Sequence, residues 1–308
     1  MLRFFVPENT NSASERAEAI NIQIKDFLHM EAFSDLLKIL EVDIDSLGVI
    51  YNGRLKENGS VAETQELKPL ESLEKNREDL YPLFRELGFI DINKPRKDKN
   101  SHIIILGGSL SACFERTKYA KKMLDETTRF VDAFTCYRPV AGVERNASVD
   151  FCPDTEFGAM SESFVSVFDL NRSEYSEKFK SDRNLNRISC IRNYEKTGDR
   201  TFRIFAAPSS EPAVRRADTG DTFRFYMETE AENGPDDSFL FITNNRYCNR
   251  QFLQLAYQMI EFEYPGTIDV IGCLPDDRVT SVERYDPFQY LQDLIGIIDW
   301  ADRFDKLV

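Results

Sequence analysis

The residues best suited to chemistry in this chain follow predicted strands. Gly107 and Gly108 come directly after the apolar run 103–106, and Ser109 or Ser111 can cap the helix pattern that begins there. Glycines let backbone N–H groups approach a ligand closely, and a helix N-terminus attracts negative charge. The sequence therefore predicts a corner that binds an anionic group. The loop matches neither GxGxxG nor GxxxxGK[ST], and a plain structural turn is the alternative interpretation.

Two acidic residues are the candidates for catalysis. Glu156 and Asp221 fall near the starts of helix patterns that follow strands, where a carboxylate can act as a general base or hold Mg²⁺. The alternative for both is ordinary helix N-terminal chemistry, because acids are favoured in a first turn. Histidine supplies no candidate. His29 falls in a helix pattern, and His102 precedes the first strand, at the sheet end opposite the usual ligand crevice.

Residues with hydroxyl, amide and guanidinium groups also lie at the ends of these strands or at the starts of the next helices. Arginines can hold a phosphate or carboxylate group through paired hydrogen bonds. The alternative is that these residues have no binding role, because exposed loop ends are polar in any soluble protein. The predicted ligand-binding residues are Gly107, Gly108, Ser109, Arg116, Arg138, Glu144, Arg216, Thr219, Thr222, Asn244 and Asn245.

Alternating strands and helices must position these residues. Strand patterns cover 103–107, 130–136, 201–206, 238–243 and 267–272. Helix patterns lie at about 111–126, 155–169, 219–231, 247–262 and 286–305. This alternation predicts an α/β fold with a doubly wound, mainly parallel, five-stranded sheet of Rossmann-like type, whose ligand crevice lies at the C-terminal strand ends. An insert at 171–200 interrupts the alternation of strands and helices. The default interpretation is a solvated excursion of the chain, and a lid or an extra helix are the alternatives.

The first 99 residues form an N-terminal helical segment that we expect to pack on the core domain, residues 100–308. Helix patterns cover 12–47 and 69–87, the second of them ended by Gly88. A polar loop is expected between these two patterns, at 50–68. Before the first strand, the charged stretch 93–100 is typical of a linker.

Composition excludes several classes of protein. The formal net charge of −14, with 39 Lys and Arg against 53 Asp and Glu, argues against a nucleic-acid partner. Six cysteines without a CxxC pair favour reduced, buried thiols over a disulfide framework or a structural metal. No secretory signal and no apolar stretch of about 18 residues is present, which predicts a soluble cytoplasmic protein without a membrane partner. No cofactor can be assigned.

Five short elements occur in a fixed order along the chain. They are Leu106 and Gly107 with Arg116; Arg138, Pro139 and Val140 with Glu144; Thr155 and Glu156 with Met160; Arg216, Asp218, Thr219, Asp221 and Thr222; and Thr243 to Tyr247 with Gln251. Their order and spacing resemble the YdcF-like family, which includes SanA and ElyC, and most closely an uncharacterised soluble bacterial branch of it. The chain departs from that pattern at Val140, Asp218 and Arg246, where the family usually has Leu, Asn and Pro.

The resemblance implies a Rossmann-like fold with a polar crevice and no settled reaction. Relatives have been linked to S-adenosylmethionine binding and to cell-envelope functions. Two functions stay open. One is an enzyme acting on a nucleotide-like or phosphorylated small molecule in this crevice. The other is a non-catalytic module that binds S-adenosylmethionine or a nucleotide, or that meets a protein partner through residues 1–99. A nicotinamide-dependent dehydrogenase is disfavoured because the glycine fingerprint is absent.

Overall fold

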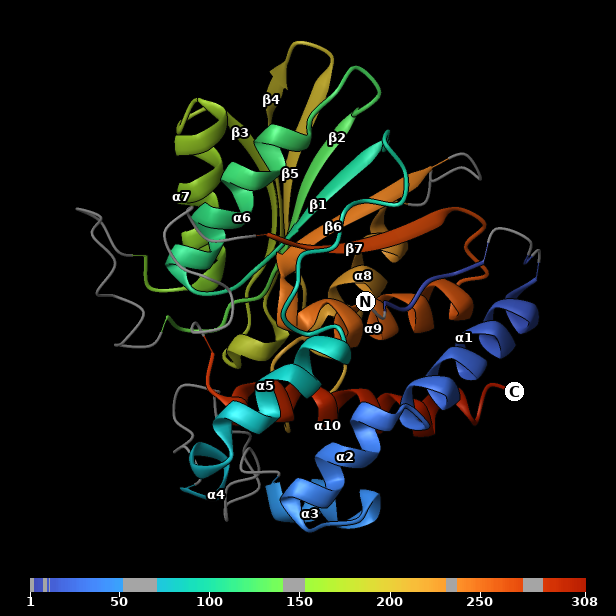
Figure 1. Ribbon diagram of the computed structural model, residues 1–308. Helices are drawn as coiled ribbons and strands as arrows, with labels where there is room; N and C mark the ends of the chain where they lie inside the picture. Colours follow the sequence, from blue (N-terminus) through green and yellow to red (C-terminus); the bar gives the residue numbers. More distant parts are fainter. Residues whose placement is uncertain are drawn as a thin grey trace. The chain divides into compact units, whose positions relative to one another are not determined.

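The computed structural model describes residues 3–7, 10, 12–51, 71–140, 153–230, 237–273 and 285–308 (Figure 1). Contacts divide the chain into two compact units. The sheet unit comprises residues 94–244 and 265–273, and the helical unit comprises residues 1–93, 245–264 and 274–308. The predicted division at residue 99 grouped the last two helices with the sheet, whereas the structure groups them with the N-terminal helices.

Seven strands form the sheet: β1 (His102–Leu106), β2 (Phe130–Thr135), β3 (Tyr175–Lys180), β4 (Ser189–Thr197), β5 (Arg200–Ala206), β6 (Ser238–Asn244) and β7 (Thr267–Cys273). Their order is β3-β4-β5-β2-β1-β6-β7. The five strands from β5 to β7 are parallel and are the five that the sequence predicts. β3 and β4 are antiparallel, so the sheet is mixed and larger than the expected five strands.

The parallel strands lie in an order that fixes where a ligand crevice belongs. Counted along the chain, they are third, second, first, fourth and fifth across the sheet. The order reverses between β1 and β6, and in open α/β sheets ligands bind outside the carboxyl ends of the strands at such a reversal. The turns after β1, β2 and β6 are therefore the ones to inspect.

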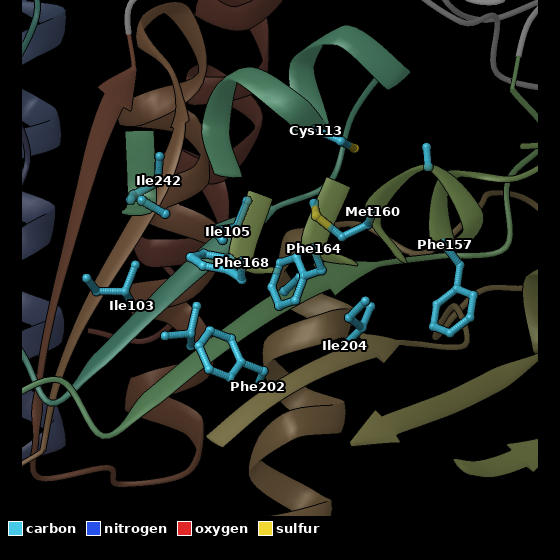
Figure 2. Packing of buried hydrophobic residues seen from close by; sticks show 14 of the residues in the cluster. Ile103, Ile105, Cys113, Phe157, Met160, Phe164, Phe168, Phe202, Ile204 and Ile242 are labelled. Carbon is cyan, nitrogen blue, oxygen red and sulfur yellow. The ribbon is translucent and has the colours of Figure 1, made fainter. Parts of the chain in front are cut away.

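Helices of the sheet unit cover both of its faces. α6 (Leu110–Met123) and α7 (Glu156–Phe168) pack on one face, and α8 (Thr219–Thr229) packs on the other. Figure 2 shows Phe164 and Phe168 of α7 beside Ile105 of β1 and Phe202 of β5. β1 is buried along its whole length, as its apolar run predicts for a strand covered on both faces.

The insert at 171–200 is not a solvated excursion, and that default interpretation is wrong. It forms β3, a short helix η3 (Leu185–Arg187) and β4, which extend the sheet beyond β5. Every residue of β3 is exposed, with Phe179 at 52%. A strand exposed on both faces shows no apolar alternation, which explains why the sequence pattern did not reveal it.

The helical unit contains α1 (Ala13–Leu28), α2 (Glu31–Leu40), α3 (Ile44–Tyr51), α4 (Glu71–Lys75), α5 (Arg77–Glu86), the short helix η4 (Asn245–Tyr247), α9 (Cys248–Glu261) and α10 (Pro287–Phe304). The predicted helix patterns are confirmed in type and approximate extent. Gly88 has φ +84°, the left-handed conformation expected just after a helix C-terminus. Buried aromatic rings join α5 to α10, with Phe84 and Tyr290 5.2 Å apart between centroids. Most of the predicted loop at 50–68 lies outside the described residues.

Two expectations from composition concern both units. The five described cysteines are free and buried, as predicted for reduced thiols, while Cys152 lies outside the described residues. Across the described ranges, none of the helices combines the length and apolarity that crossing a membrane requires.

Candidate functional site at the C-terminal ends of the strands

Close packing requires Gly107 after β1 and leaves little space at Gly108. A Cβ on Gly107 would lie 2.4 Å from Glu156 Oε1 and 3.0 Å from the Phe134 carbonyl. A Cβ on Gly108 would lie 3.3 Å from the Arg116 guanidinium. Neither glycine has a positive φ. The Gly107 N–H donates to the Phe134 carbonyl at 2.7 Å, so this N–H is not available to a ligand.

The start of α6 offers the N–H groups that the sequence predicts for anion binding. Ser109 is the N-cap, and its hydroxyl accepts from the Ala112 N–H at 3.3 Å. Among the residues that the structure describes, no acceptor is bonded to the N–H groups of Gly108, Ser109, Leu110 or Ser111. Unpaired N–H groups and the helix dipole together favour a bound anion at this turn.

Arg138 and Glu156 form a buried ion pair beside the glycine turn. Arg138 Nε donates to Glu156 Oε2 at 2.6 Å, and the two side chains are 8% and 6% exposed. Backbone contacts bring them together: the Glu156 N–H donates to the Arg138 carbonyl at 3.0 Å, and Thr155 caps α7 through the Gly158 N–H. The loop after β2 and the start of α7 are thereby fixed against each other.

Cys136 shares the Glu156 carboxylate with Arg138. The Cys136 N–H donates to Glu156 Oε1 at 3.3 Å, and its Sγ lies 3.8 Å from the same oxygen. Burial and the neighbouring Glu156 charge raise the pKa of the Cys136 thiol to about 11, although Arg216 acts in the opposite direction. A thiol held protonated is a poor nucleophile. Cys136 is therefore a packing residue at this edge.

Arg116 lies beneath the site. It is 2% exposed, and its guanidinium donates to the Leu106 carbonyl and to Asn244 Oδ1, each at 2.7 Å, and also to the Gly107 carbonyl. Arg116 thus joins the ends of β1 and β6 at the point where the strand order reverses. Through these hydrogen bonds, Arg116 and Asn244 hold the backbone of the glycine turn in place.

Asp221 begins α8 and has the contacts that helix N-terminal chemistry predicts. It forms a capping box with Asp218, accepts from the Ser210 N–H at 3.2 Å and pairs with Arg215. Burial alone would raise the Asp221 pKa, but the hydrogen bonds from Arg215, Ser210 and Asp218 outweigh it and lower the pKa. Thr222 donates to the Asp218 carbonyl at 3.0 Å. Within the described residues no bond joins Asp221 to Arg138 or Glu156.

The remaining predicted residues have different locations. Arg216 is exposed and lies close enough to Cys136 for its charge to act on the thiol, and Thr219 is the first residue of α8. Asn245 belongs to the helical unit, where its Nδ2 donates to the Ile90 carbonyl at 2.8 Å. Glu144 lies outside the described residues. The edge of the sheet unit thus gathers the glycine turn, Arg116, Arg138, Glu156, Arg216 and Asn244.

Two residues of this edge are absent from the predicted ligand-binding residues, although Thr243 belongs to the fifth of the sequence elements. Arg215 is the ion-pair partner of Asp221, and only its place in the run RRADTGDT could have suggested it. Thr243, in β6, is fully buried, and its hydroxyl has no partner among the described residues. Over the same residues, no three His, Cys, Asp or Glu side chains gather closely enough to hold a metal ion.

A half-open hollow of about 310 Å³ lies over α7 and β4. Its lining residues are Pro153, Asp154, Gly158, Ser161, Glu162, Val165, Arg172, Arg192 and Tyr194. Its two arginines are already neutralised, Arg172 by Glu162 at 2.5 Å and Arg192 by Glu177 at 2.7 Å. The hollow is therefore a weaker candidate for binding an anion than the start of α6.

Comparison with known proteins adds no relative. No family model matches the chain, and neither a curated protein nor a solved structure shows a significant match. The resemblance to the YdcF-like family stays a prediction that rests on the five sequence elements. Function must be argued from the site itself.

Proposed function

We propose that the protein binds the anionic group of a nucleotide-like or phosphorylated small molecule at the start of α6. The observation that carries the proposal is the set of four N–H groups, from Gly108 to Ser111, that have no acceptor within the described part of the chain. They follow β1, at the reversal of strand order where ligands bind in this class of sheet. Phosphate oxygens are suitable acceptors for such groups.

An enzyme acting on the same ligand is the second candidate, and the position of Glu156 favours it. The carboxylate lies against Gly107, so an anion held by the next four N–H groups would lie near it. Arg138 bonds Glu156 through one nitrogen and can transfer to a ligand phosphate, which would free the carboxylate as a general base. Asp221 accepts four hydrogen bonds, one each from Ser210 and Asp218 and two from Arg215, and is the less available acid.

Replacing Ser111 by Asp tests the binding proposal without disturbing the fold. Ser111 is exposed in the first turn of α6, where an acid stabilises the helix by about 0.3–1 kcal/mol. The added charge repels a bound anion, and we expect Ser111→Asp to weaken phosphate binding about tenfold. Titration calorimetry with inorganic phosphate measures the effect, and Ser111→Asn is the neutral control of the same size. Equal phosphate affinity in the two variants contradicts the proposal.

A ligand panel separates binding from catalysis. Nucleotides, phosphorylated sugars and S-adenosylmethionine are titrated first, and every compound that binds is then assayed for turnover. Product formation excludes a purely binding role. The isosteric variants Glu156→Gln and Asp221→Asn then assign the chemistry, with circular dichroism to confirm folding. Wild-type turnover in both variants ends the catalytic assignment of these two residues.

A further inference from the structure

The connection between β3 and β4 carries positive charge that the described residues do not neutralise. We name residues 180–187 the basic loop, and its cations are Lys180, Arg183 and Arg187, all exposed. Asp182 is its single acid, and that carboxylate accepts from the Asn184 N–H at 2.8 Å. In the described part of the chain no carboxylate pairs with any of the three cations.

Pairing registers place the basic loop at the same edge of the sheet as the candidate site. Lys180 pairs with Ser189, and Cys190 pairs with Ala206 at the C-terminal end of β5. Three hydrogen bonds fix the loop to the segment after β5. The Ser209 N–H donates to the Asn186 carbonyl at 2.7 Å, and the Pro212 carbonyl accepts from Asn184 Nδ2 at 2.9 Å and from Asn186 Nδ2 at 3.2 Å. The loop is thus a built part of this edge.

Between α6 and the basic loop, the positive charges are largely neutralised. Glu156 pairs with Arg138, and Asp221 pairs with Arg215. Among the described residues, positive potential therefore remains at the start of α6 and at the basic loop, and the exposed Arg216 adds charge at the same edge. Three strand spacings separate β1 from β4, which is about 14 Å. A chain of phosphates that starts at α6 and extends over β2 and β5 comes within about one Debye length, roughly 8–10 Å, of the loop.

We infer that the ligand carries several linked phosphates and extends from the start of α6 toward the basic loop, which attracts the phosphates beyond the first. This inference rests on the proposed function, because the α6 N–H groups hold the first phosphate. The rest of the protein disfavours such a ligand, since the formal net charge is −14. An unneutralised basic loop at this one edge lowers the local repulsion where the ligand must enter.

Three substitutions in the loop test the inference, with three elsewhere as a matched control. The loop variant is Lys180→Gln, Arg183→Gln and Arg187→Gln. The control variant is Lys97→Gln, Lys118→Gln and Lys122→Gln, which are exposed residues before β1 and along α6, away from its start. Each variant removes three positive charges and takes the net charge from −14 to −17. All six side chains are exposed, so we expect both variants to fold.

Titration calorimetry with inorganic triphosphate and with inorganic phosphate gives the readout, at about 50 mM and 200 mM salt. We expect triphosphate to bind the wild type about tenfold more tightly than phosphate at low salt, and this preference to shrink at high salt. The loop variant loses most of the preference and keeps its phosphate affinity within about twofold, whereas the control variant keeps both affinities.

Three other results overturn the inference. If the loop variant binds triphosphate as the control does, the loop plays no part. If the wild type binds phosphate and triphosphate equally, the ligand is not recognised by linked phosphates, and the proposed anion site stands alone. If the wild type binds neither, the proposed function fails and the inference fails with it.

Discussion

Among the described residues of the sheet unit, two buried arginine–carboxylate pairs differ in how the guanidinium bonds the carboxylate. Arg203 of β5 donates to both oxygens of Asp132 in β2, at 2.7 and 2.8 Å, and to Glu230 at 2.6 Å. Its guanidinium lies 4.7 Å from the centroid of the Phe130 ring and 5.6 Å from that of Tyr226. Asp132 is fully buried on the α8 face of the sheet.

The second pair, Arg138 and Glu156, is nearly as buried, but a single guanidinium nitrogen joins the arginine to the carboxylate. The Glu156 carboxylate accepts a hydrogen bond from one guanidinium nitrogen of Arg138, at 2.6 Å. Its other donors are the backbone N–H and the thiol of Cys136. Its carboxylate lies against the glycine turn at the C-terminal edge of the sheet. Burial therefore does not distinguish the two pairs, since the Arg side chains are both 8% exposed. What distinguishes them is the geometry of the pairing: Arg203 bonds both oxygens of Asp132, whereas Arg138 bonds one oxygen of Glu156.

The contrast indicates which pair can change partners. A bidentate pair in an aromatic enclosure gains nothing from a ligand, and removing one member leaves an uncompensated buried charge. An arginine joined to its carboxylate through one nitrogen, at a strand end, can exchange that hydrogen bond for one to a phosphate. We therefore assign Asp132 and Arg203 to stability and Arg138 and Glu156 to the candidate site.

The environment of Asp132 supports the structural role. His102 lies 3.8 Å from Asp132 through Nδ1 and 3.5 Å from Asp237 through Nε2. Burial would raise the Asp132 pKa, but the charge of Arg203 and hydrogen bonds from His102 and Arg203 outweigh it and lower the pKa. Burial and the Asp132 charge raise the pKa of Tyr226. The lowered pKa keeps Asp132 ionised, and this cluster lies at the strand end opposite the candidate site.

The largest expected effect comes from removing Arg203. Arg203→Met leaves the Asp132 carboxylate buried without its cation, and we expect a loss of about 3–5 kcal/mol in the free energy of unfolding, measured with urea. Arg138→Met leaves Glu156 with its backbone donor, and we expect a smaller loss. The double variant Asp132→Leu with Arg203→Met is expected to regain most of the stability. Equal losses for the two arginines would remove the distinction between the pairs.

A side chain at the glycine turn is expected to disrupt the Glu156 pair directly. Gly107→Ala places a Cβ 2.4 Å from Glu156 Oε1, and we expect a loss of about 1–3 kcal/mol. Gly108→Ala meets Ala112 at 3.1 Å and costs less. Urea unfolding of Gly107→Ala, Glu156→Ala and the combination measures the coupling between the two positions. Strict additivity would show that the two residues do not compete for the same space.

Replacing each arginine by lysine tests whether the bidentate geometry matters more in one pair than in the other. Lys supplies a point charge and no fork, so Arg203→Lys loses the bidentate geometry, with an expected cost of about 1–2 kcal/mol. Arg138 bonds Glu156 through one nitrogen, and the expected cost of Arg138→Lys is about half of that. Thermal unfolding monitored by circular dichroism compares them. A larger cost at Arg138 would reverse the assignment.

The smallest expected effect is a pH dependence at Asp221. Its pKa is lower in the folded state than the ordinary value of about 3.9, so the ionised carboxylate stabilises the fold above about pH 4. This contribution is lost as the pH falls through the folded-state pKa. We expect Asp221→Asn to cost about 1 kcal/mol at pH 7 and the difference to shrink below pH 4. Urea unfolding from pH 3 to 7 measures it, and a constant difference would contradict the lowered pKa.

The sequence predicts the parallel strands because each is a short segment of mostly apolar residues, although β2, β5 and β7 also contain Asp132, Arg203 and Asp269. Ile103 to Leu106 is uniformly apolar and uniformly buried, so period and length identify the strand. β3 could not be found in this way, since Tyr175 and Phe179 are its only large apolar residues and both are exposed. Its strand conformation depends on pairing with β4, which is a tertiary effect.

At the site, the sequence predicts positions but not partners. Strand ends of a parallel sheet meet at one edge, which brings Gly107, Arg138 and Glu156 together as expected. That Arg138 bonds Glu156, and Arg215 bonds Asp221, depends on the course of loops that have no period. Arg116 illustrates the same limit. Its spacing from Gly107 placed it near the turn, but only the structure shows that it donates to the carbonyls beneath it.

The division of the chain into interleaved units also constrains how it can fold. The chain passes between units four times, after residues 93, 244, 264 and 273. The helical unit therefore needs residues from both chain ends, and it cannot be completed until the last helix has left the ribosome. Contacts of such large sequence separation slow folding, because long loops must close first. A fragment ending at residue 99, or one beginning at residue 100, would expose apolar surface and aggregate where the full chain folds.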